Sequence, residues 1–304
     1  MRPQSRRCYG AGTLSTLPSA SRLRSLGIVP KLNSAEALRL ASRIAEYAEH
    51  KGLKVYMDSR TRGLIDWLRY FSLGVDEVDV IAVVGGDGTI LRTMHLLGDL
   101  EIPILTIRHG KRGFLADVPP HDFALAIDRL LSGVYSLHEY MRLAVQTERV
   151  DNIPYALNDA VVTTSSDSRG KVCRLRVMKY SQGGVPERVL TVVGDGVITS
   201  TPVGSTAYSL AAGGPIVDPL MRAIVITPLA PISLCSRPVV LPDHVKVSVE
   251  VEGDSHPVEL FVDGVLISRL EPGDTILVSK APKPAKVIRF FTEDYFSKVF
   301  ERCL

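Results

Sequence analysis

The first half of the chain takes its fold from one stretch, Val78-Asp79-Val80-Ile81-Ala82-Val83-Val84-Gly85-Gly86-Asp87-Gly88-Thr89. The run from 78 to 84 is rich in β-branched residues and stops at two glycines, which predicts a buried parallel strand. Helical spacing follows from Thr89 to about Leu97, and a second strand is expected at 102–107. This strand-turn-helix-strand order predicts an α/β fold with a doubly wound parallel sheet.

The residues before this stretch extend the same pattern. Ser34 can cap a helix that runs to about His50 with apolar residues at helical spacing, and Gly52 ends it. A strand is expected at 52–57 and another short helix at 64–71. We place this α/β domain at residues 27–136.

From about Leu137 the pattern changes to short alternating strands separated by Gly, Pro and Asp. This texture predicts an antiparallel, β-rich second domain at 137–284. One helix-like stretch, 205–212, interrupts it. We expect a C-terminal arm, about 285–304, to return to the first domain and complete it, with a helix or arm over its last residues from 291.

Composition excludes several classes of protein. The 304 residues carry a net charge of +3 with no stripe of basic and aromatic residues, so nucleic acid is not an expected partner. The apolar runs are far shorter than the roughly 20 residues of a spanning helix, so no membrane is expected. The four cysteines form no CxxC pair, which suits a reducing, cytoplasmic setting. Residues 1–26 lack acids and are expected to be a disordered extension, with a transit peptide as the alternative.

The turn at 85–89 has the features of a phosphate site. Glycines at 85, 86 and 88 permit close backbone approach, and amides at a helix N-terminus favour an anion. The carboxylate of Asp87 would repel a phosphate, so its presence in the turn indicates a functional role. Two roles fit: accepting a proton from an attacking hydroxyl, or holding Mg²⁺. The alternative is a tight turn in which Asp87 bonds its own backbone. The turn is neither a Walker A loop nor a GxGxxG fingerprint.

A second glycine-rich block, Asp195 to Pro215, is rich in small hydroxylated residues. Gly204 and the pair Gly213-Gly214 allow a ligand to lie against backbone, and Tyr208 offers a flat face for a base.

Gly-Gly-Asp-Gly-Thr resembles the signature shared by NAD kinases, diacylglycerol and sphingosine lipid kinases and, more loosely, phosphofructokinases. The second block resembles the NAD kinase pattern alone. Further segments match that family in order: Gly110 to Leu115, Leu157-Asn158-Asp159, Thr227 to Pro231 and Val262-Asp263-Gly264. The similarity spans about residues 24–300.

The resemblance implies a kinase that phosphorylates the 2′-hydroxyl of the adenosine ribose of NAD to give NADP. It leaves open ATP or polyphosphate as donor and NAD or NADH as acceptor. It also implies a divalent metal ion, Mg²⁺, and a homodimer or homotetramer. The competing hypotheses are a lipid kinase and a non-catalytic nucleotide-sensing module.

The resemblance also implies roles for individual residues. Asp87 would be the catalytic acid/base, and Asp195 would bind the nicotinamide-side ribose. The remaining nucleotide-binding candidates are Gly85, Gly86, Gly88, Thr89 and Arg92 near phosphates, Asn158 and Asp159 at the adenosine, the pocket-lining Thr206, Ala207, Tyr208, Ser209, Leu210 and Ala211, and Lys171, which aligns less surely with a basic contact.

Some positions depart from the family pattern. Arg108 and Arg112 replace the usual Asn and Leu, and either supply charge for a phosphate donor or lie on a solvated face. The histidines form no metal-spaced pair, so none is given a role, and only His109 beside the glycines is singled out for testing.

Overall fold

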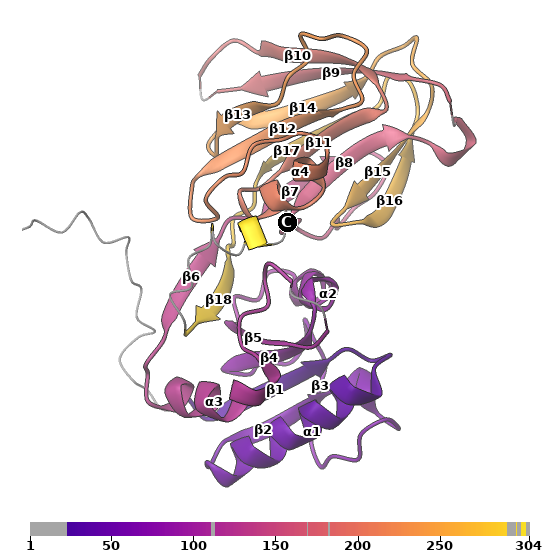
Figure 1. Cartoon of the computed structure of the whole chain (residues 1–304). Helices are drawn as coiled ribbons and strands as arrows, with labels where there is room; N and C mark the ends of the chain where they lie inside the picture. Colours follow the sequence, from indigo (N-terminus) through magenta and orange to yellow (C-terminus); the bar gives the residue numbers. More distant parts are fainter. Residues whose placement is uncertain are drawn as a thin grey trace, which may run out of the picture.

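The computed structural model of the chain describes residues 23–110, 113–168, 170–181, 183–290, 296 and 299–301. Most of the predicted extension at 1–26, the Arg112 position and most of the predicted arm at 291–304 lie outside the described residues. The described chain forms two lobes, a parallel-sheet lobe and a β-rich lobe (Figure 1).

The first lobe is built on a seven-stranded sheet. Its strands, in spatial order, are β3 (Tyr70–Phe71), β2 (Lys54–Asp58), β1 (Ser25–Pro30), β4 (Val80–Gly85), β5 (Ile104–Arg108), β18 (Ala285–Arg289) and β6 (Ser136–Tyr140). All neighbours are parallel except β6, which runs antiparallel to β18. The chain thus returns after the β-rich lobe to add β18 beside β5.

Helices cover both faces of this sheet. The side chains of β4 alternate between two cores: Val80, Ala82 and Val84 pack with α1 (Ala35–His50) and α3 (Phe123–Leu131). Ile81 and Val83 pack instead with α2 (Asp87–Leu97). A strand buried on both faces explains why its sequence shows no polar alternation. The prediction of a doubly wound sheet is confirmed.

The helix predicted before Gly52 is confirmed. Ser34 caps α1, because its Oγ accepts from the amide of Ala37 at 3.3 Å, and the expected apolar face is buried.

The helix predicted at 64–71 is wrong. The segment forms a turn and then β3, parallel to β2. Leu68 is 84% exposed, so the apolar spacing did not mark a buried face. The segment is held instead by long-range and local hydrogen bonds, from Trp67 Nε1 to the carbonyl of Val55 and from Tyr70 OH to that of Ile65.

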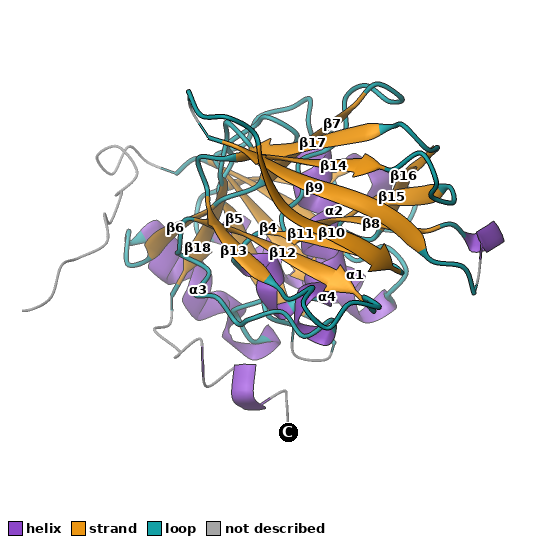
Figure 2. Ribbon diagram, turned by 90° about the horizontal axis from the view of Figure 1, so that it is seen from above, coloured by secondary structure: helices purple, strands orange, loops and turns teal. Residues whose placement is uncertain are grey.

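The second lobe contains two antiparallel sheets that pack face to face (Figure 2). One consists of β10 (Glu187–Gly194), β9 (Cys173–Tyr180), β14 (Lys246–Val251), β17 (Thr275–Lys280) and β7 (Leu143–Thr147). The other consists of β13 (Val239–Pro242), β12 (Ala223–Leu229), β11 (Gly196–Ser200), β8 (Asp159–Thr164), β15 (Val258–Val262) and β16 (Val265–Leu270). Their inner faces form one apolar core, which confirms the predicted antiparallel, β-rich architecture.

The outer face of the six-stranded sheet carries a smaller apolar cluster of Val161, Ile198 and Leu229, with Phe261 packed against it. The helix predicted at 205–212 is broken. A 3-10 turn at Val203–Thr206 is followed by a single-turn helix, α4 (Tyr208–Ala211), because Ala207 leaves helical geometry with ψ −128°. In the part of the chain that the structure describes, no helix is both long and apolar enough to cross a membrane.

Candidate active site

The glycine turn lies between β4 and α2, where Gly86 is the N-cap residue. A Cβ at Gly85 would lie 2.4 Å from Thr89 Oγ1, so the turn closes only because Gly85 has no side chain. The carbonyl of Gly86 accepts from the amide of Thr89 at 2.9 Å, which starts the helix. The amides of Asp87 and Gly88 precede this bond at the positive end of the helix, where an anion is favoured.

Asp87 is the first residue of α2, and a neighbouring loop holds its carboxylate. Oδ2 accepts from the amide of Phe114 at 2.7 Å, and Oδ1 accepts from the amide of Leu115 at 3.1 Å. A Cβ at Gly113 would lie 2.0 Å from Asp87 Oδ1, so only glycine allows this approach. The side chain is thus fixed by backbone of a distant loop and not by its own turn.

A cavity of about 540 Å³ opens beside the glycine turn. Gly86, Gly88 and Thr89 form one part of its wall, and the cationic side chains of Lys31 and Arg60 line it as well. The remaining lining residues are Pro30, Leu32, Asn33, Arg92, Thr93, His109 and Gly110. Among the described residues that line it there is no carboxylate, so the cavity suits an anionic ligand such as a chain of phosphates.

A second cavity, of about 380 Å³, lies on the outer face of the six-stranded sheet. Its apolar residues Leu91, Val161 and Phe261 are combined with polar ones, chiefly Asn158 and Asp159. Thr163, Ala207, Tyr208, Asp263 and Gly264 complete the lining. An apolar wall with a few fixed polar groups is the usual composition of a pocket for a small organic ligand.

The two cavities share α2. Thr89, Arg92 and Thr93 line the first cavity, whereas Leu91 lines the second. Asp87 stands at the start of the same helix, one turn before Leu91. The structure therefore brings the glycine turn and the Asn158-Asp159 pair to one helix, although Thr89 and Asn158 are 69 positions apart in the sequence.

Asp263 holds the polar end of the second cavity. Its carboxylate accepts from the amides of Leu157, Asn158 and Asp159 at 2.8, 2.7 and 3.0 Å. Sequence reasoning matched the Val262-Asp263-Gly264 segment to the family but gave Asp263 no role. Asp263 has a φ of 45° and Gly264 a φ of 79°, as a tight hairpin turn requires. The Asp-Gly pair between two apolar runs was the local signal available in the sequence.

Asp159 is buried next to this carboxylate, with 5% of its surface exposed. Burial, reinforced by the negative charge of Asp263, raises the pKa of the Asp159 carboxyl to about 7. At neutral pH a substantial fraction of this side chain is a neutral acid, which both donates and accepts hydrogen bonds.

The second glycine-rich block packs against the backbone of Asn158, a residue that lines the second cavity. A Cβ at Gly204 would lie 2.0 Å from the carbonyl oxygen of Asn158, so glycine lets the block pack directly on that backbone. Thr201 completes the contact, since its amide donates to the carbonyl of Asn158 at 2.9 Å.

The predicted ligand residues of this block have different environments. Ala207 and the half-exposed Tyr208 line the second cavity. Thr206 is buried and its hydroxyl donates to the carbonyl of Val203. Ser209 is buried with its Oγ 2.8 Å from Thr227 Oγ1. Leu210 is partly buried, and Ala211 is exposed.

Other predicted contacts lie farther out. Asp195 is exposed, but its carbonyl accepts from the hydroxyl of Thr163, a residue of the second cavity, at 2.9 Å. Lys171 is exposed in the loop before β9. Arg108 is partly buried at the end of β5, with its amide bonded to the carbonyl of Val118. His109 lines the first cavity and contacts Ser34 Oγ at 2.9 Å.

The returning strand β18 adds a residue that sequence reasoning missed. Arg289 Nη1 donates to the carbonyl of Leu115 at 3.1 Å, and Nη2 donates to Tyr140 OH at 3.1 Å. Burial opposes the charge of Arg289, but Tyr140, Asp117 and Asp87 outweigh it and raise the pKa of the guanidinium. Arg289 thus secures the loop that holds Asp87.

The described residues bring no group of three or more His, Cys, Asp or Glu side chains together at metal-binding distances. A magnesium ion needs few protein ligands when phosphate oxygens and water complete its octahedron. Asp87 is the carboxylate at the glycine turn, and a carboxylate oxygen that accepts one amide still has a second lone pair.

Comparison with known proteins assigns the chain to a family. The ATP-NAD kinase N-terminal domain model matches residues 26–135, and the ATP-NAD kinase C-terminal domain model matches 158–290. The chain is 39% identical to an NAD kinase of Thermococcus kodakarensis over 272 residues, covering 88% of this chain and 95% of that protein. It is 35% identical to an NAD kinase of Moorella thermoacetica over 287 residues, covering 92% and 89%.

Solved structures share the fold. A yeast NADH kinase complexed with NADH superposes with a TM-score of 0.81 at 24% identity, covering 92% of this chain and 87% of that one. An NAD kinase from Archaeoglobus fulgidus in complex with ATP gives a TM-score of 0.72 at 24% identity, with 91% and 98% covered. On these matches the chain belongs to the NAD kinase family and is a kinase that phosphorylates NAD.

Proposed function

We propose that this NAD kinase transfers the terminal phosphoryl group of ATP to the 2′-hydroxyl of the adenosine ribose of NAD, giving NADP and ADP. The observation that carries the proposal is the shared helix: α2 lines a cationic cavity on one side and a mixed apolar and polar cavity on the other. Asp87 stands at its N-terminus. A donor phosphate and an acceptor hydroxyl bound on the two sides would meet near Asp87.

The second cavity is the proposed site for NAD. Leu91, Val161 and Phe261 offer apolar contact to a base, while Asn158 and Asp159 supply donors and acceptors suited to a nucleoside. Tyr208 and Ala207 lie in the same wall. Asp195 and Lys171 are proposed as ligand contacts at the edge of the site. Four neighbours of Ala207 and Tyr208 are proposed to support the wall of the cavity: Thr206, Ser209, Leu210 and Ala211.

The first cavity is the proposed site for the donor's phosphates. Lys31 and Arg92 would balance the negative charge, whereas the guanidinium of Arg60 is already paired with Asp58. The amides of Gly86 and Gly88 lie at the positive end of α2. A bound Mg²⁺ would neutralise charge on the phosphate oxygens and would be held mainly by them, with Asp87 as the available protein ligand.

In the proposed step, Asp87 accepts the proton of the 2′-hydroxyl as the ribose oxygen bonds to the terminal phosphorus. The bond from that phosphorus to the bridging oxygen breaks, and ADP leaves with its electron pair. During this step, hydrogen bonds from the amides of Phe114 and Leu115 hold the carboxylate of Asp87 in place beside the hydroxyl. Phosphoryl transfer depends on such positioning of the reacting groups.

The test is Asp87→Asn, which keeps the size of the side chain and removes the proton acceptor. We expect NAD binding, measured by calorimetry, to change less than threefold while kcat falls by about 10²-fold to 10⁴-fold. Turnover close to that of the unaltered protein would contradict the role of Asp87.

The donor and acceptor are settled by one coupled assay that crosses NAD and NADH with ATP and polyphosphate. We propose ATP and NAD as the preferred pair of donor and acceptor.

We further propose that the protein is a cytoplasmic homodimer or homotetramer. Its domains are proposed at 27–136 and 137–284, and the arm at 285–304 completes the first of them. Light scattering of the purified protein measures the oligomeric state.

A further inference from the structure

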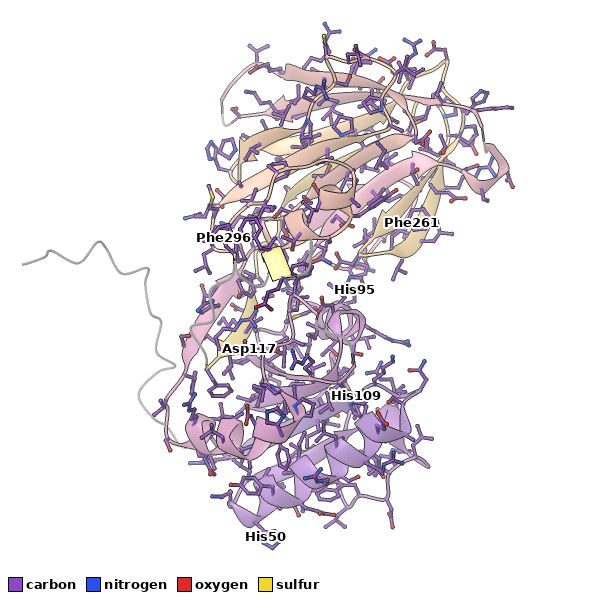
Figure 3. The ribbon with its side chains drawn as sticks, in the orientation of Figure 1. His50, His95, His109, Asp117, Phe261 and Phe296 are labelled. Atoms are coloured by element: carbon purple, nitrogen blue, oxygen red, sulfur yellow. The ribbon has the colours of Figure 1, made fainter. Side chains whose placement is uncertain are left out.

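His95 links the two lobes at the site. It lies in the last turn of α2, and its Nε2 is 2.9 Å from Asp263 Oδ2 in the hairpin between β15 and β16. The two residues are 168 positions apart, and their side chains are 10% and 0% exposed. Figure 3 shows His95 on the side of the parallel-sheet lobe that faces Phe261 and the β-rich lobe.

The partner of His95 is the residue that organises the second cavity. The carboxylate of Asp263 accepts hydrogen bonds from the three backbone amides of residues 157–159. The backbone amide of Asp263 donates to the carbonyl of Asp159 at 2.9 Å. Because a carboxylate only accepts, His95 carries a proton on Nε2 in this contact. One hydrogen bond therefore joins α2 to the residue that holds the backbone of the Asn158-Asp159 pair.

The same face of α2 carries Asp87, Leu91 and His95, which are spaced by four residues each. At 100° per residue these positions form one stripe along the helix. Leu91 lines the second cavity, and the carbonyl of Gly98 just after the helix accepts from Arg142 Nη1 at 2.9 Å. Among the described residues, the His95 contact is the one hydrogen bond between side chains along this stripe, and it joins α2 to the β-rich lobe.

We propose that His95 is a positioning residue that sets α2, and with it Asp87, against the NAD cavity through Asp263. The proposal rests on the proposed function, because it assumes that Asp87 accepts the proton and that NAD occupies the second cavity. Without the side chain of His95, Asp263 still accepts hydrogen bonds from three backbone amides, so the NAD cavity keeps its shape. What is lost is the alignment of Asp87 with the bound hydroxyl.

The experiment measures kcat, KM for NAD, NAD affinity by calorimetry and the thermal midpoint for His95→Leu, His95→Gln and Asp263→Asn. His95→Leu is expected to lower kcat by roughly 10-fold to 100-fold while NAD affinity changes less than threefold. His95→Gln keeps an N–H donor near the position of Nε2 and is expected to restore kcat to within about threefold. Asp263→Asn is expected to raise KM for NAD, because it weakens the bonds to the cavity backbone.

His50→Leu is the matched control, since His50 also lies in the last turn of its helix, α1, but is exposed and outside the site. It should leave every parameter unchanged. An unaltered kcat in His95→Leu overturns the proposal, and so does a loss of NAD affinity as large as that in Asp263→Asn. Should His95→Leu fail to fold, His95→Gln is compared with His95→Asn, which is too short to reach Asp263. Equal kcat in those two variants also overturns it.

Asp87→Asn is included in the same assay to separate the two proposals. Turnover in Asp87→Asn close to that of the unaltered protein refutes the proposed role of Asp87, on which the role of His95 rests. An inactive Asp87→Asn beside a fully active His95→Leu refutes only the role of His95.

Discussion

Asp159→Asn should make the protein's stability respond less to pH. The Asp159 carboxyl has a pKa of about 7 in the folded protein, against 3.8 for an ordinary aspartate, because it is buried beside Asp263. Between these two values the folded chain keeps a proton that the unfolded chain has released. Folding is therefore favoured at the low end of this window, and that stability is lost as pH rises through 7.

The size of the effect follows from the two pKa values. In this window the free energy of unfolding falls by up to about 1.4 kcal/mol for each pH unit. Between pH 4.5 and pH 8 the contribution of Asp159 amounts to about 3 kcal/mol. Asparagine has nearly the same shape, remains neutral at every pH and does not pay the cost of ionising in this site.

The assay is guanidinium chloride unfolding of both proteins without ligand at several pH values from 4.5 to 8. The stability of Asp159→Asn relative to the unaltered protein should rise by about 3 kcal/mol across that range, with most of the change below pH 7. Asp151→Asn makes the same chemical change at an exposed loop position and should show a pH-independent difference within about 0.5 kcal/mol. A constant difference for Asp159→Asn would refute the argument that burial holds its proton.

Two glycine variants test the close approaches in the site. In Gly113→Ala the new Cβ would lie 2.0 Å from Asp87 Oδ1, so the carboxylate must move by about 1 Å, and kcat should fall by about 10²-fold with little change in NAD affinity. Gly253→Ala, where nothing lies within 4 Å, is its control, and a Gly113→Ala enzyme as active as that control would contradict the geometry. In Gly204→Ala the new Cβ would lie 2.0 Å from the carbonyl of Asn158, which should cost about 1–3 kcal/mol of stability and raise KM for NAD. A thermal midpoint and KM equal to those of the unaltered protein would contradict the second prediction.

The local pattern of the sequence was sufficient for the main elements of the first lobe. The buried strand before Gly85, the glycine turn and the capped helix after Ser34 each depend on residues within one or two turns of chain, and all three form as predicted. The prediction of a helix at 64–71 was wrong because the conformation of this segment depends on a hydrogen bond to Val55 in β2. The spacing of apolar residues within the segment contains no information about that distant partner.

The site itself divides in the same way. The sequence by itself determined the glycine turn, the candidate acid Asp87 and, through the resemblance, the family. Only the tertiary structure decided that the amides of 114 and 115 hold Asp87, that Arg289 returns to secure that loop, and that Asp263 organises the second cavity. It also gave a partner to His95, which the sequence had left without a role. These contacts join residues 27 to 174 positions apart, and no local periodicity encodes them, because they depend on how separate strands and helices pack.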